Sequence, residues 1–85
     1  MKVWGRIRAD NKTVAESVIE IPEKDAQSVS DWMEPIGEVC GKLDLSRPVI
    51  LEKHINDLLK FSHTNFKSSD FMESVKFDRL EIELF

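Results

Sequence analysis

The sequence predicts an α+β fold, a two-layer sandwich with a mainly antiparallel sheet, whose elements follow the order β-β-α-β-α-β. Three observations predict this class. Two strand-like segments flank a short polar turn near the start, the middle repeats apolar residues at helical spacing, and the end alternates apolar with charged residues. Because 85 residues suffice for one small core, we expect residues 1–85 to form a single domain.

The first two segments, residues 2–9 and 13–21, are rich in β-branched and other apolar residues. Between them lies the polar turn "DNK", in which Asn11 can adopt a left-handed conformation at low cost. This arrangement predicts a β-hairpin.

A three-residue turn gives this hairpin a register in which apolar residues pair with apolar residues and charged residues pair with oppositely charged ones. The predicted cross-strand pairs are Val3 with Ile19, Ile7 with Ala15, Lys2 with Glu20, and Arg6 with Glu16. One face is then apolar and the other is charged, whereas a shift by one residue mixes the two. The register leaves Trp4 beside Val18 on the charged face, so Trp4 is either covered by a second element or part of a contact surface.

The middle of the chain carries the strongest helical pattern. Apolar residues recur there at spacings of three and four, at Val29, Trp32, Met33, Ile36, Val39, Cys40 and Leu43. Since proline is tolerated in the first turn, Pro35 predicts that the regular helix begins near Ser30 or Asp31, or bends at the proline. Cys40 lies within the apolar stripe, which favours a buried thiol over a reactive one.

The second half predicts three further elements. The apolar run Val49 to Leu51, after Arg47 and Pro48, indicates a short strand. Helical spacing returns in "EKHINDLLKF", with its apolar side predicted at Leu51, Ile55, Leu58 and Leu59. This second helix packs at an edge of the sheet or on its other face, where it covers Trp4. The ending "RLEIEL" alternates, which predicts a strand with Leu80, Ile82 and Leu84 facing the core. Glu81 and Glu83 are expected to solvate the other face and to protect a sheet edge.

Composition limits the classes of function. The net charge of -4 disfavours nucleic acid, although Lys2, Arg6, Arg8 and Lys12 form the basic patch that such binding needs. A single cysteine allows no internal disulfide, and no apolar run approaches the roughly 20 residues that span a bilayer. We therefore expect a cytoplasmic protein without a membrane partner. No phosphate-binding glycine motif or nucleophile elbow occurs, and we expect no cofactor.

The segment "EKHINDLLKFSHTNFKSSDF" carries the candidate catalytic chemistry, because it contains both histidines. His54 and Asp57 are three residues apart on one helix face, as two metal ligands or a base and its carboxylate partner are. His63 joins them only if the helix ends near Phe61 and the chain turns back. These three residues define the alternative function, a small metal-dependent or acid-base enzyme, whereas polar side chains around a helix end are the commoner meaning of this pattern.

Several stretches of the second half, "LDLSRPVILEKH", "TNF", "DF" at residues 70 and 71, and "FDRLEIELF", resemble a family of short uncharacterised bacterial proteins of unknown activity. The resemblance covers roughly the second half of the chain. It implies a bacterial cytosolic protein and carries over no activity.

The function that the sequence favours is a non-catalytic protein-interaction module or a homodimerising domain. Its contact surface is predicted at Trp4, Arg6 and Arg8, because interfaces favour Trp and Arg over Lys and Glu. The expected partner is another protein or a second copy of the chain.

Overall fold

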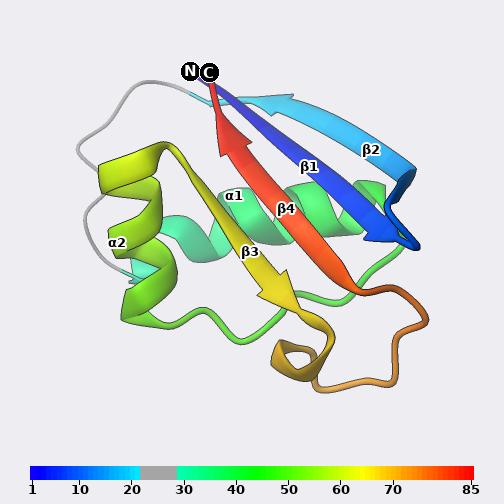
Figure 1. Ribbon diagram of the computed structural model, residues 1–85. Helices are drawn as coiled ribbons and strands as arrows, with labels where there is room; N and C mark the ends of the chain where they lie inside the picture. The colour runs from blue at the N-terminus through cyan, green and yellow to red at the C-terminus, as the bar shows by residue number, and fades with distance from the viewer. Residues whose placement is uncertain (22–28) are drawn as a thin grey trace.

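The computed structural model describes residues 1–21 and 29–85, and in them it contains two α-helices and four strands (Figure 1). In chain order the elements are β1 (Lys2–Ala9), β2 (Lys12–Glu20), α1 (Val29–Lys42), α2 (Glu52–Phe61), β3 (His63–Lys67), the 3-10 turn η1 (Ser68–Asp70) and β4 (Arg79–Leu84). The α+β class is confirmed.

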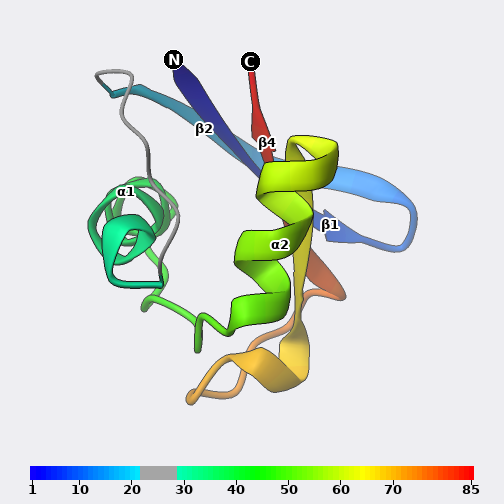
Figure 2. The same cartoon turned by 90° about the vertical axis from the view of Figure 1, so that its left-hand side faces the viewer.

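The four strands form one antiparallel sheet in the order β2-β1-β4-β3. Helix α1 lies across one face of this sheet, and α2 lies beside β3 at the sheet edge (Figures 1 and 2). Side chains of both helices join a single apolar cluster with the inward-facing residues of the strands. The molecule therefore has two layers, and the predicted edge position of the second helix is the one observed.

The hairpin register agrees with the prediction at each of the four pairs named from the sequence. The turn itself is shorter than predicted, because only Asp10 and Asn11 form it, with positive φ angles of 51° and 62°. A bulge between Ile7 and Arg8 then shifts the pairing by one residue. The bulge adds one residue and the shorter turn removes one. The cross-strand pairs beyond the bulge, and so the residues on each face, are therefore those predicted.

Helix α1 presents the predicted stripe to the sheet. Trp32, Ile36, Val39 and Cys40 are buried, whereas Met33 is exposed; the side chain of Val29 lies outside the part of the chain that the structure describes. The helix approaches β1 so closely at Gly5 that a Cβ atom placed there would clash with Cγ1 of Val39. The absence of a side chain on Gly5 therefore sets the spacing between α1 and the sheet.

The third strand lies after the second helix rather than before it. Residues 49–51 have no strand pairing, and the strand is instead β3, in which Thr64 and Phe66 are buried between exposed neighbours. The helix ends at Phe61, which meets the condition that was set for His63 from the sequence, and Ser62 reverses the chain with a φ of 61°. This reversal lays β3 back along α2, and β3 pairs with β4 in an antiparallel ladder.

Helix α2 faces the core with a different set of residues from the one predicted. Ile55 and Leu58 are buried as expected, but Leu51 and Leu59 are about half exposed and His54 is buried in their place. The backbone N–H of Leu51 donates to Nδ1 of His54 at 3.0 Å, which satisfies one buried polar atom of the histidine. The ring of His54 also packs on Phe66, with centroids 4.2 Å apart.

In the described part of the chain, neither helix is long and apolar enough to cross a membrane.

Candidate functional site

The face of the sheet away from α1 is the open face, and Figure 1 looks directly onto it. No helix of the described residues lies on this face (Figures 1 and 2). Because side chains alternate along a strand, the residues on this face occupy every second position of β1, β2, β3 and β4. The open face consists of Lys2, Trp4, Arg6, Arg8, Thr13, Glu16, Val18, Glu20, His63, Asn65, Lys67, Arg79, Glu81 and Glu83.

Trp4 lies at one end of the open face, partly exposed and without a covering helix. The guanidinium of Arg6 stacks on its indole ring at 4.0 Å from the centroid, and the ring of Phe85 meets it edge-on at 5.9 Å. The neighbouring Val18 is 43% exposed. Together Trp4, Val18 and Phe85 form an apolar end of the open face, and cation–π stacking by Arg6 orients the tryptophan.

Glu81 lies near the middle of the open face, where it is shared by three arginines. Its carboxylate is 3.7 Å from Nε of Arg6, 3.5 Å from Nε of Arg8 and 3.8 Å from Nε of Arg79. These separations exceed those of good charged hydrogen bonds, which are about 2.7–2.9 Å. Nε of Arg6 and Nε of Arg8 are buried without a hydrogen-bond partner among the described residues. One carboxylate thus compensates three guanidinium groups incompletely.

Glu81 and Glu83 lie on the face away from the core, as predicted, but their predicted role as protectors of a sheet edge is wrong. Strand β4 lies between β1 and β3, so it has no free edge for them to protect. Their side chains instead face the arginines of the open face, and Glu83 lies 3.9 Å from an Nη atom of Arg6.

Arg8, Arg79 and Lys67 form the basic row, three neighbouring cations on three adjacent strands. The ladder pairs Arg8 with Arg79 and Arg79 with Lys67. Like charges directly opposite each other destabilise a sheet, and no carboxylate of the described strands occupies this row. The sequence places Lys67 and Arg79 in two separate segments. Their adjacency depends on the order of the strands in the sheet, which a single sequence does not reveal.

The three residues predicted for a metal or acid-base site do not gather. His54 is buried in the helical layer, whereas His63 is exposed at the start of β3, paired with Glu83 of the open face. Asp57 accepts a hydrogen bond from the Thr64 hydroxyl at 3.0 Å, which ties α2 to β3. Within residues 1–21 and 29–85, no three His, Cys, Asp or Glu side chains lie close enough to hold a metal ion.

His54 instead faces Asp70 of η1. Its Nδ1 accepts the Leu51 N–H, so the proton of the neutral ring is on Nε2, which lies 3.6 Å from Oδ2 of Asp70. The same carboxylate oxygen accepts the N–H of Lys67 at 2.9 Å. Burial lowers the pKa of His54, and the nearby charge of Asp70 opposes this shift. The pair therefore links the start of α2 to the end of β3 through a neutral histidine.

Cys40 has the buried position that the sequence predicts. Loss of contact with water raises its pKa to about 11, and the charge of Arg47 opposes the shift. At neutral pH the buried thiol is therefore protonated, and the protonated form is the less nucleophilic one.

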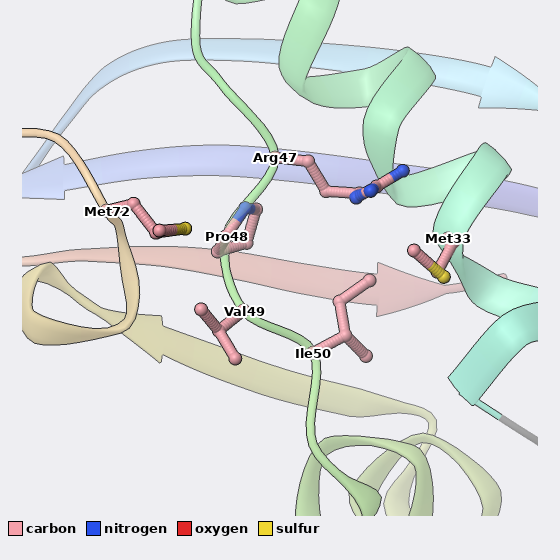
Figure 3. A pocket seen from close by; sticks show the side chains of 6 residues that line it. All are labelled: Met33, Arg47, Pro48, Val49, Ile50 and Met72. Atoms are coloured by element: carbon pink, nitrogen blue, oxygen red, sulfur yellow. The ribbon is translucent and has the colours of Figure 1, made fainter.

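A hollow of about 270 Å³ opens on the helical side of the molecule, opposite the open face. Figure 3 shows segment 47–50 passing in front of the strands, with Met33 of α1 on one side and Met72 on the other. The lining residues are Met33, Arg47, Pro48, Val49, Ile50 and Met72. The hollow is mostly apolar, and Arg47 is the cation in its lining.

Comparisons with protein-family models, with curated proteins and with solved structures give no match to this chain. The resemblance of its second half to short bacterial proteins therefore stays a prediction.

Proposed function

We propose that this protein is a small non-catalytic interaction module of the bacterial cytoplasm, which binds another protein or a second copy of itself through the open face. Trp4 is the observation that carries the proposal. It lies on a face without a described helix, stacked by Arg6 and beside the exposed Val18. Aromatic and arginine side chains are enriched at the centres of protein interfaces and contribute most of their binding energy.

Two further features support an interaction module over an enzyme. Of the titratable groups that the sequence offered for catalysis, His54 and Asp57 lie on α2 and His63 lies in the sheet, and each has a structural partner or an exposed position. The open face, by contrast, holds buried polar donors for which the described residues provide no hydrogen-bond acceptor, namely Nε1 of Trp4 and Nε of Arg6 and Arg8. The bacterial and cytoplasmic parts of the proposal are supported only by the sequence, through its resemblance and its single cysteine.

Site-specific photo-crosslinking tests this proposal. A photoreactive phenylalanine in place of Val18 samples the open face, and the same residue in place of the exposed Glu38 of α1 samples the helical layer. We expect one discrete product from position 18 in the cells that make the protein, identified by mass spectrometry and lost when Trp4→Ala is added. Equal products from both positions, or a product that persists with Trp4→Ala, would contradict the proposal.

A further inference from the structure

We infer that the open face recognises an extended acidic segment of a partner protein, with an apolar side chain at the Trp4 end and carboxylates at the basic row. This inference rests on the proposed function and adds the chemistry of the partner.

The charge of the basic row indicates an anionic partner. Its three members, Arg8, Arg79 and Lys67, adjoin one another in the ladder. Arg8 and Arg79 share the carboxylate of Glu81 with Arg6, and Arg6 also approaches Glu83, so three arginines share the charge of Glu81. Adjacent like charges cost stability in a sheet, and an incoming carboxylate offsets that cost.

Two further carboxylates near the basic row, those of Asp78 and Asp70, form no ion pair with it among the described residues. Oδ2 of Asp78 accepts the N–H of Asp10 at 3.1 Å, whereas Oδ2 of Asp70 accepts the backbone N–H of Lys67 at 2.9 Å and faces Nε2 of His54. Arg8 uses its two Nη groups within the hairpin, donating to the Thr13 hydroxyl at 2.6 Å and to the Asn11 carbonyl at 3.3 Å. For Lys67 the described residues provide no ion pair at all. The excess positive charge is therefore centred on Lys67 and Arg79.

The net charge of -4 does not prevent this binding. At physiological salt the Debye length is about 8 Å, so charges on the far layer are largely screened from a ligand in contact with the open face. On the β2 side, Glu16 and Glu20 face Arg6 and Lys2 and balance them. An acidic segment is thus attracted to the basic row rather than to the β2 side of the face.

The geometry also sets the spacing of the partner's residues. Trp4 and Arg8 are four residues apart on β1, which is roughly 13 Å in an extended strand. An extended ligand covers the same distance in four residues. The matching segment therefore has an apolar residue and, four positions before or after it, acidic residues.

The test uses a fluorescein-labelled peptide with a leucine and, four residues further on, two glutamates, titrated with the full chain. We expect saturable binding at low salt that weakens as salt is added. Lys67→Glu should weaken it by at least about tenfold. The same change places a glutamate opposite Arg79, so thermal stability should stay constant or rise. If Lys67 had a purely structural role, the substitution would not weaken peptide binding while leaving thermal stability constant or higher.

The matched control is Lys42→Glu, an equal change of charge at an exposed residue of α1, which should leave peptide binding unchanged. A second control peptide places the leucine directly beside the glutamates and should bind more weakly. Equal losses for Lys67→Glu and Lys42→Glu, or no binding of the unaltered protein, would overturn the inference. The proposed function still stands in that case if position 18 crosslinks.

Self-association gives the remaining outcome. If analytical ultracentrifugation shows a dimer that Lys67→Glu dissociates, the open face binds a second copy instead of an acidic segment, which rejects this inference and leaves the proposed function intact. Binding of a single-stranded oligonucleotide in preference to the peptide would reject both.

Discussion

The contacts of His54 in the structure are those of a structural residue, although the sequence around it suggests a chemical role. It is fully buried, its Nδ1 accepts the Leu51 N–H, and its ring packs on Phe66. In a capping box, a glutamate or glutamine at the third helical position accepts the N–H of the capping residue through its side chain. His54 occupies that position in α2 and takes the same role. The histidine thus stabilises the start of α2 while remaining neutral.

The lowered pKa of His54 makes the stability of the protein depend on pH. The unfolded chain takes up a proton near pH 6.5, but the folded chain resists protonation to a lower pH, so acid favours the unfolded state. Stability should therefore fall as the pH drops below about 6.5. His54→Gln keeps an acceptor for the Leu51 N–H and removes the titration, so its melting temperature should fall less between pH 7 and 5.5. Equal losses in the two proteins would contradict this account of His54.

The burial of Cys40 predicts slow reaction with thiol reagents. With a pKa of about 11 instead of the usual 9.0, the folded protein at pH 8 holds roughly one hundredth of the usual thiolate. An aromatic disulfide reagent should therefore label the native protein at least about a hundredfold more slowly than the denatured protein. Rapid labelling of the native protein would show that the apolar stripe of α1 does not face the sheet.

The contact between α1 and β1 is the central packing feature at the level of elements. Gly5 faces the helix, and a Cβ atom there would clash with Cγ1 of Val39 and lie 3.5 Å from Cδ1 of Ile82. Strand β4 pairs with β1 on one side and β3 on the other, so any shift of α1 away from Gly5 disturbs the middle of the sheet.

Gly5→Ala should therefore destabilise the protein by about 1–3 kcal/mol, the usual cost of overpacking a core. Val39→Ala alone should also destabilise it, because it leaves a small cavity. The two changes together should cost less than their sum, since the new methyl group occupies the space that the valine vacates. Urea denaturation of the four proteins measures this coupling, and strictly additive losses would show that the two residues do not touch.

The elements also show what a single sequence predicts and what it does not. The hairpin register was predicted because one alignment separates Val3 and Ile19 from Lys2 and Glu20, and the bulge preserved it. The third strand was misplaced because "PVIL" has more apolar residues than "HTNFK", where only Thr64 and Phe66 face the core. A short edge strand needs few apolar residues, since backbone hydrogen bonds to its partner β4 also hold it in the sheet.

At the scale of the whole molecule, the two faces of the sheet have different roles. One face is covered by α1 and carries the apolar core, and the other carries Trp4 and a network of charges (Figures 1 and 2). That Trp4, Arg6 and Arg8 share one face was predictable, because they alternate on one strand. The basic row was not, since it joins residues from three strands whose order depends on the fold.

Hydroxyl-radical footprinting of the protein inside the cells that make it, compared with the purified protein, tests the open face most directly. Trp4 and Phe85 report on the open face, and Met33 and Met72 report on the hollow of the helical side. We predict that oxidation of Trp4 and Phe85 falls in cells while oxidation of the two methionines stays the same. Protection of Met33 and Met72 with no change at Trp4 and Phe85 would contradict the account and place the contact surface at the hollow.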